Sequence, residues 1–238
     1  MHSAEAHASL AHVMLFYDWD WPGAEREFQR ALELNPQCEM AHHGYSALLA
    51  AQHRWDDSVA EARRAVEADP LSLPANYFLG LILGWAGRYD EALEQFRQTL
   101  ELDPHMTGAQ FGIADIYLRK GMEKQSVEHR LKWTALAGDV EKAASLGRAY
   151  EQGGIRGLRK RDLELALAEW KGWHWTTGDI AALYAALGQP DEAMKWLEKA
   201  YEARSAVAVL IPVDPDAYKP LHSDPRYQDL LRRIGLPR

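Results

Sequence analysis

The sequence predicts an all-α protein, a right-handed solenoid of about six helix–turn–helix repeats followed by a C-terminal capping helix. Pro36, Pro70 and Pro104 are evenly spaced, thirty-four residues apart, and each follows a similar run of small, apolar and acidic residues. A repeat of this length is typical of stacked helical pairs, each of which buries its apolar side only against its neighbours. No alternation of apolar and polar residues with a period of two lasts long enough to indicate a β-strand.

The third copy of the repeat is the most regular and indicates how each pair packs. Gly80 lies on the apolar stripe of its first helix, and Phe96 lies on the stripe of the second helix that packs against it. A side chain at position 80 would keep the two helices apart, so their close approach must outweigh the ~1 kcal/mol helix penalty of glycine. The expected copies span residues 5–38, 39–72, 73–106, 107–139, 140–173 and 174–207, which together form an array over 1–207 followed by a Pro-rich tail and capping helix over 208–238.

The two ends of this array are expected to differ. The first helix, about Ala6–Tyr17, carries Leu10 and Val13 with no earlier repeat to cover them, although arrays usually have a polar cap at each end. This end is therefore expected to pack on another domain or a second copy, or to begin an excised piece. At the other end, a helix over about Pro225–Ile234 has its apolar residues on one side and is expected to cap the sixth pair.

Composition excludes several classes of function. The formal net charge of the 238 residues is -8, which disfavours nucleic acid as a partner, because affinity for phosphate backbones rests on Lys and Arg. A single cysteine, Cys38, excludes an intramolecular disulfide. No apolar run approaches the roughly 18 residues of a membrane span, and the N-terminal stretch lacks a basic region and carries Glu5, unlike a secretory signal. A cytoplasmic location is expected, with no membrane contact.

The repeats resemble tetratricopeptide repeats, a 34-residue helix–turn–helix family. The resemblance covers roughly residues 5–207 and rests on a combination: large, small and large side chains in the first helix, alanine then an aromatic residue in the second, and proline at the exit. It departs from the family pattern at His12 and Ser46, where glycine or alanine is usual, and at Arg130 in a core position. The tail over 212–227 is similar to the C-terminal repeat region of large bacterial signalling and transcriptional regulators.

The resemblance implies a non-catalytic scaffold that binds a protein or peptide, as a module of a larger bacterial regulator. In such arrays the first helices line a concave groove, and an exposed apolar surface of that extent usually marks a binding site. Two alternatives stay open: neighbouring copies or the tail fill the groove, or the uncovered N-terminal repeat makes the chain a homo-oligomerisation module that forms a homodimer. The residues expected to line the groove are Val13, Phe16, His43, Tyr77, Leu81, Phe111, Asp115 and Arg148.

No catalytic, metal or cofactor site is predicted. The sequence has no Gly-rich phosphate loop, nucleophile elbow or His-Glu-x-x-His run. The paired Lys and Asn with which some family members grip chaperone tails are absent from the corresponding positions, so chaperone-tail binding is not expected. Trp170, Trp173 and Trp175 surround His174, and this cluster is interpreted as a plug between two imperfect repeats, with an aromatic cage for a cation as the alternative.

Overall fold

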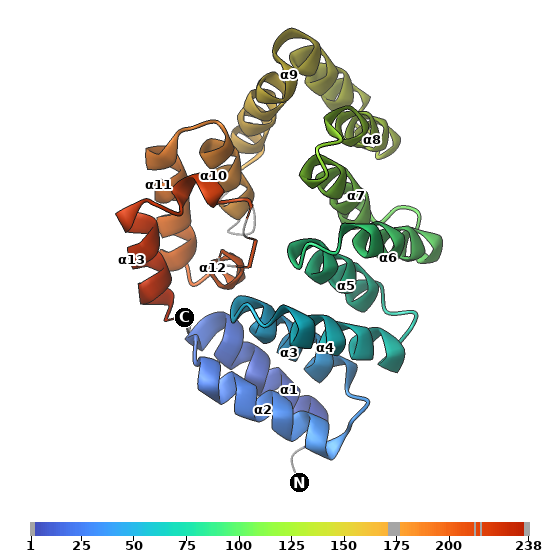
Figure 1. Ribbon diagram of the computed structural model, residues 1–238, viewed down its shortest axis with the longest axis vertical. Coiled ribbons are helices and arrows are strands. Elements are labelled where there is room, and N and C mark those ends of the chain that lie inside the picture. The colour runs from blue at the N-terminus through green and yellow to red at the C-terminus, as the bar shows by residue number, and fades with distance from the viewer. Residues whose placement is uncertain (1–2, 171–176, 212, 215, 236–238) are drawn as a thin grey trace. The chain divides into compact units, whose positions relative to one another are not determined.

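The computed structural model (Figure 1) describes residues 3–170, 177–211, 213–214 and 216–235, and every regular element among them is helical. This confirms the predicted all-α class. The elements are α1 (Ala4–Val13), the π-helical turn η1 (Met14–Asp18), α2 (Trp21–Leu34), α3 (Glu39–Ala51), α4 (Trp55–Ala68), α5 (Leu73–Trp85), α6 (Tyr89–Leu102), α7 (Thr107–Arg119), α8 (Glu123–Leu136), α9 (Val140–Glu169), α10 (Thr177–Ala186), α11 (Pro190–Glu202), α12 (Ala206–Leu210), the 3-10 turn η3 (Lys219–Leu221) and α13 (Pro225–Ile234).

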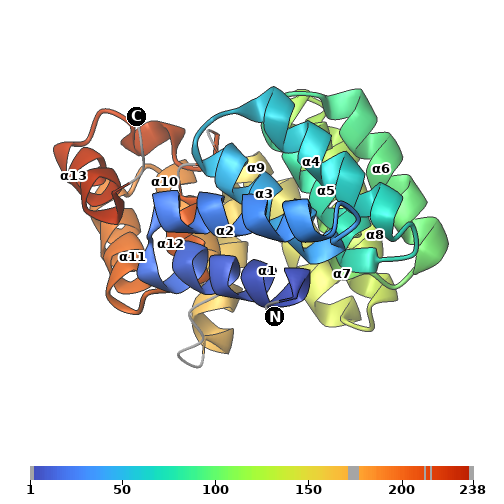
Figure 2. The ribbon, with the colours of Figure 1, turned by 90° about the horizontal axis from the view of Figure 1, so that it is seen from below.

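The chain divides into two compact units. Unit 1 comprises Met1–Ala11 and Pro22–Gly147, and unit 2 comprises His12–Trp21 and Arg148–Arg238. In unit 1, α3 pairs with α4, α5 with α6 and α7 with α8, and each pair stacks on the next. Figure 2 shows α3 to α6 running side by side. The first helices of neighbouring pairs also contact each other, α3 with α5 and α5 with α7.

The evenly spaced prolines end the second helices of unit 1. A proline disfavours the α conformation in the residue before it. Asp69 and Asp103, which precede Pro70 and Pro104, accordingly have extended backbones with φ of -141° and terminate α4 and α6. The next helix then starts with a cap where the sequence provides one, because the Ser72 side chain accepts a hydrogen bond from the Ala75 amide at 3.3 Å.

The turn between the two helices of a pair has a left-handed residue at the same place in four successive repeats. Trp19, His53, Gly87 and Gly121 lie thirty-four residues apart and have φ of 59°, 57°, 76° and 74°. Glycine adopts this conformation without penalty, whereas other residues lose about 1–2 kcal/mol. Trp19 and His53 therefore adopt a conformation that glycine adopts at the equivalent position of the next two repeats.

Replacing His53 by glycine should stabilise the protein. His53 is exposed, and its ring meets only the edge of the Trp55 ring at 5.6 Å among the contacts described, so little packing is lost. Relief of the left-handed penalty, less the entropy that glycine adds to the unfolded chain, gives an expected gain of about 0.5–1 kcal/mol. A urea titration followed by circular dichroism measures the gain. The reverse change, Gly87→His, should destabilise, and equal stability of all three proteins would contradict this account of the turn.

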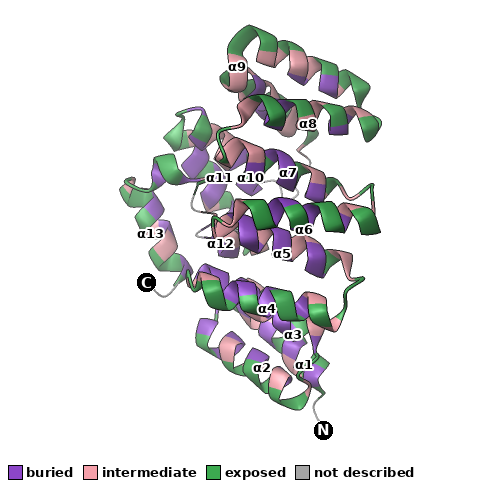
Figure 3. Ribbon diagram, turned by 45° about the vertical axis from the view of Figure 1, so that its right-hand side comes forward, coloured by how far each residue is buried: buried purple, intermediate pink, exposed green. Residues whose placement is uncertain are grey.

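Phe96 is the central packing element of unit 1. Its ring is buried at 1% exposure between two glycines, Gly80 on α5 and Gly112 on α7. A Cβ atom at Gly112 would lie 2.5 Å from the ring, and one at Gly80 would also overlap the ring. The predicted role of Gly80 is thus confirmed, and the same ring joins the third pair to the fourth. Figure 3 shows the buried residues of these helices on the sides where the pairs meet.

Unit 2 contains a less regular part of the array. Within α9 the chain changes direction at Gly154, which has φ 60° and ψ -154°. α10 and α11 form the next helical hairpin, and α12 and α13 both contact α11. α13 has the predicted bounds, is capped at its start by Asp224, and buries Tyr227, Leu230 and Ile234.

The N-terminal segment differs from the expected single helix over Ala6–Tyr17. The α-helix ends at Val13, and a π-helical turn carries the chain to Trp19. The turn buries Leu15 completely and contacts α12 within unit 2. The helical periodicity of the segment could not indicate this contact, because it joins residues far apart in the sequence.

Candidate functional site

The first and second helices of unit 1 differ sharply in charge. α5 has no charged residue, and α3 and α7 together carry only Glu39, Asp115 and Arg119. The second helices α4, α6 and α8 carry sixteen charged residues between them. Unit 1 as a whole is acidic, with twenty Asp and Glu against thirteen Lys and Arg. Its first helices thus present a surface with few charges within a charged unit.

Aromatic side chains follow this surface from α3 to α7. The His43 and Phe78 ring centroids lie 4.4 Å apart, which joins α3 to α5, and Phe78 meets the edge of Trp85 at 6.4 Å. Tyr77 lies against Gly108 of α7, where a Cβ atom would be 2.9 Å from the Tyr77 ring. All of these rings are half-buried, so one side of each is accessible to solvent. We call the following residues the first-helix face: His43, Tyr77, Phe78, Leu81, Trp85 and Phe111.

The α7 end of the first-helix face is the most exposed part and lies next to charge. Phe111 is 46% exposed, and the guanidinium of Arg130 from α8 lies 5.8 Å from its ring centroid. Asp115 accepts a hydrogen bond from Arg119 on its own helix at 2.7 Å. Arg130 thus stands where the repeat usually has an apolar core residue and contacts the aromatic surface through its cationic side chain.

Of the eight predicted groove residues, five lie on first helices of unit 1. His43, Tyr77, Leu81 and Phe111 belong to the first-helix face, and Asp115 lies beside it. The other three belong to unit 2: Val13 is 46% exposed, Phe16 is half-buried with its ring 5.9 Å from His12, and Arg148 is exposed on α9.

A set of polar pairs between the two helices of each repeat was missed in the sequence. The paired residues are nineteen positions apart in three successive repeats: His42 with Glu61, Asn76 with Gln95, and Gln110 with His129. Their donor–acceptor distances are 2.6, 2.8 and 2.7 Å. The signal was available, because each partner recurs every thirty-four residues as a polar residue inside an apolar stripe.

The His42–Glu61 pair holds a buried charge. His42 Nδ1 donates to the Glu61 carboxylate at 2.6 Å and Nε2 donates to the Pro36 carbonyl at 3.0 Å. Because both acceptors lack protons, the protonated imidazolium satisfies both hydrogen bonds. Burial by itself lowers the pKa of His42, but the hydrogen bonds to Glu61 and Pro36 outweigh it, so the pKa is raised above its ordinary value. Arg64 also pairs with Glu61.

This pair should make the stability of unit 1 depend on pH. A histidine whose pKa is raised by folding stabilises fully below its unfolded pKa, and that contribution is lost as the pH rises through the folded value. The double substitution His42→Asn with Glu61→Gln installs the neutral pair of the next repeat. The stability advantage of the wild type over this variant should shrink as the pH rises from about 6 to about 9. Urea titrations across that range measure it, and a constant difference would contradict the assignment.

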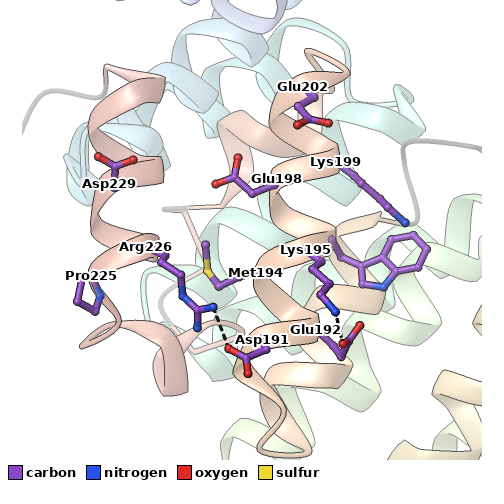
Figure 4. Close-up of a pocket in the computed structure, with 11 residues that line it drawn as sticks. Asp191, Glu192, Met194, Lys195, Glu198, Lys199, Glu202, Pro225, Arg226 and Asp229 are labelled. Carbon is purple, nitrogen blue, oxygen red and sulfur yellow. Dashed lines mark hydrogen bonds and ion pairs between the residues drawn. The ribbon is translucent and has the colours of Figure 1, made fainter.

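Unit 2 has a shallow cleft of about 920 Å³ between α11 and α13 (Figure 4). Its basic side chains are already engaged: Arg226 pairs with Asp191 at 2.8 Å and Lys195 with Glu192 at 2.6 Å. The Lys199 ammonium lies 3.9 Å from the centroid of the Trp196 ring. This internal neutralisation indicates a contact that holds α13 in place, so we do not assign the cleft as the functional site.

The predicted tryptophan cluster is described only in part. Trp173, His174 and Trp175 lie outside the described residues. Trp170 meets the edge of Trp196 at 4.9 Å, and Lys199 lies 5.1 Å from the Trp170 ring. The cation at this pair of rings is therefore supplied by the chain itself.

Among the residues that the structure describes, no group of three or more His, Cys, Asp or Glu side chains gathers in a way that could hold a metal ion. No described helix combines the length and apolar character needed to cross a membrane.

Comparison with known families decides the classification. Three family models, each described as a tetratricopeptide repeat, match residues 16–73, 86–129 and 175–209. The chain belongs to the tetratricopeptide repeat family. The matches include His43 and Phe111 of the first-helix face and the hairpin of α10 and α11, whereas residues 74–85, with Tyr77, Phe78, Leu81 and Trp85, lie between two of them. No curated protein matches the sequence.

Solved structures with similar folds are distant in sequence. The pilF protein of Pseudomonas aeruginosa aligns with a TM-score of 0.57 at 16% identity, over 97% of this chain and 97% of its own. The Cut9–Hcn1 hetero-tetramer of APC/C gives a TM-score of 0.57 at 16% identity, over 98% of this chain and 43% of that one. The Thermobaculum terrenum O-GlcNAc transferase gives 0.50 at 24% identity, over 56% of this chain and only 26% of the transferase. These likenesses concern the fold alone.

Proposed function

We propose that this tetratricopeptide repeat protein is a non-catalytic scaffold that binds an apolar or aromatic segment of a partner protein on its first-helix face. The repeat fold is that of a protein-interaction scaffold, and the finer assignment rests on one observation. Solvent-accessible rings line α3, α5 and α7, while the charged residues of the same unit are concentrated on the second helices.

The chemistry of this face selects the class of partner. Tyr77 and Phe111 offer ring surface, and an apolar surface of this kind suits the apolar side of an amphipathic helix or an extended apolar peptide. Because few charges lie on the first helices, binding should depend little on salt, whereas a charge-driven contact weakens as salt is added. Burial of aromatic residues typically supplies most of the energy at such interfaces.

The test uses a peptide selected from a display library on the full-length protein. Tyr77→Ala with Phe111→Ala should weaken that peptide by about 2 kcal/mol or more, roughly thirtyfold, because each ring is a binding anchor. Fluorescence titration at low and high salt measures both the loss and the expected salt independence. Leu136→Ala is the control, since Leu136 is 66% exposed on the second helix α8. Unchanged affinity in the double variant, with unchanged helicity, would exclude this face as the binding site.

Self-association through the N-terminal helix is the second candidate. Leu10, Val13 and Tyr17 are 44%, 46% and 61% exposed, which leaves apolar surface uncovered there. This candidate requires a homodimer, so light scattering over a range of concentrations should give twice the mass of one chain, and Val13→Asp should restore the single mass. A mass of 27.0 kDa at every concentration would exclude it.

A cytoplasmic location and a place within a larger bacterial regulator remain predictions from the sequence.

A further inference from the structure

The segment His12–Trp21 completes unit 2, although more than a hundred residues separate it from the rest of that unit. The Trp21 indole N–H donates to the Ile234 carbonyl, at the C-terminal end of α13, at 3.1 Å. The Trp19 ring lies 5.2 Å from the Tyr201 ring of α11. Trp19 and Trp21 are 9% and 4% exposed, so both rings are held inside this contact.

Arg204, just after α11, binds both the ring and the backbone of the segment. Its guanidinium lies 4.4 Å from the Trp19 ring centroid, a cation–π geometry. The same group donates to the Tyr17 carbonyl at 3.1 Å and to the Asp18 carbonyl at 3.5 Å. Arg204 thus recognises an aromatic ring together with the two carbonyls that precede it.

Trp19 combines a left-handed backbone with this ring contact. Trp19 occupies the left-handed turn position that later repeats give to Gly87 and Gly121. It follows a π-helical turn, Met14–Asp18, a feature that occurs frequently at functional sites. The Trp19 ring contacts Tyr201 and Arg204, whereas His53, which has the same left-handed backbone, is exposed and its ring meets the edge of Trp55.

We propose that unit 2 carries a binding site for a short aromatic peptide in which one residue separates two tryptophans. In this structure the chain's own segment Tyr17–Trp21 occupies the site, and we propose that another such peptide can displace it, so that the segment acts as a latch. The site consists of the Tyr201 ring, the Arg204 guanidinium and the terminal carbonyl of α13. Its rim is accessible, because Arg204 and Tyr17 are exposed, so an incoming segment can compete for the ring contacts. The proposal is independent of the first-helix face.

The first test supplies the segment as a separate molecule. The probe is a fluorescent peptide with the sequence of His12–Trp21, titrated into full-length wild type and into the full-length double variant Trp19→Ala with Trp21→Ala. The wild-type site is already filled, so the variant should bind the probe at least about tenfold more tightly. Adding Arg204→Ala to the variant should remove that gain. A variant with wild-type helicity that binds the probe no better than wild type would overturn the proposal.

The second test does not depend on how the tryptophan variant folds. Arg204→Ala removes an exposed side chain, and it should raise hydrogen exchange about tenfold or more in residues 14–21 while leaving α3–α6 unchanged. Arg63→Ala is the matched control, since Arg63 is an exposed arginine paired with Glu91 in unit 1. Equal exchange in residues 14–21 for wild type, Arg204→Ala and Arg63→Ala would refute the latch.

Discussion

Phe96→Ala should lower the free energy of unfolding by about 3–5 kcal/mol, the loss expected when a fully buried phenylalanine is truncated. The ring is 1% exposed and fills the space that Gly80 and Gly112 leave open on two neighbouring first helices. Neither glycine can extend a side chain to fill the cavity, so the site can relax only by moving helices. A urea titration followed by circular dichroism measures the change.

Two further variants test whether the fit between ring and glycines is the cause. Leu102→Ala, at a 41% exposed position on the same helix, should cost within about 0.5 kcal/mol. Gly80→Ala should destabilise despite the ~1 kcal/mol that alanine gains in helix propensity, because its methyl group presses on the ring. In a protein that already carries Phe96→Leu, Gly80→Ala should lower the free energy of unfolding by less than it does in the wild type, because the two changes affect the same contact. A Phe96→Ala loss below about 1.5 kcal/mol would contradict this packing account.

Glu61→Ala should cost about 1–3 kcal/mol near neutral pH, because it removes the carboxylate that is hydrogen-bonded to the buried His42 ring and leaves that ring without its partner. The side chains of the pair are 7% and 9% exposed, and the carboxylate also receives Arg64. The His42 Nδ1–H would lose its acceptor in a place that water reaches poorly. Chemical denaturation at a fixed pH measures the loss.

The comparison for this prediction is an exposed glutamate in the same unit. Glu91 pairs with Arg88 and Arg63 at 46% side-chain exposure, so Glu91→Ala should cost at most about 1 kcal/mol. His42→Asn with Glu61→Gln should cost much less than Glu61→Ala, because the neutral pair keeps the hydrogen bond between the helices. Similar losses in the free energy of unfolding for Glu61→Ala and Glu91→Ala would show that the buried pair stabilises the protein no more than an exposed ion pair does.

The regular part of the fold was predictable because its causes are local. Pro36, Pro70 and Pro104 mark helix ends through the restriction that each imposes on the preceding residue. The bounds of α13 follow from the proline at its start and its one-sided apolar stripe. Gly80 could be assigned because a glycine in a well-formed helix implies a close approach.

The less regular features of the fold depend on contacts that local periodicity cannot reveal. The π-helical turn contacts α12, and Trp21 donates a hydrogen bond to Ile234. A helical pattern carries no information about contacts between residues so far apart in the sequence. The polar pairs could have been found from their recurrence every thirty-four residues. Of the predicted binding residues, Tyr77 and Phe111 were assigned from repeat position alone, whereas the contact of Arg130 with Phe111 required coordinates.

The most direct test of the central claim is photo-crosslinking of the display-selected peptide, carrying a benzophenone side chain, to the full-length protein. Mass spectrometry then identifies the labelled residues. If the uncharged first-helix face binds the partner, the labels should fall on α5 and α7, around Tyr77 and Phe111. Labels confined to the charged second helices α4 and α6 would contradict it.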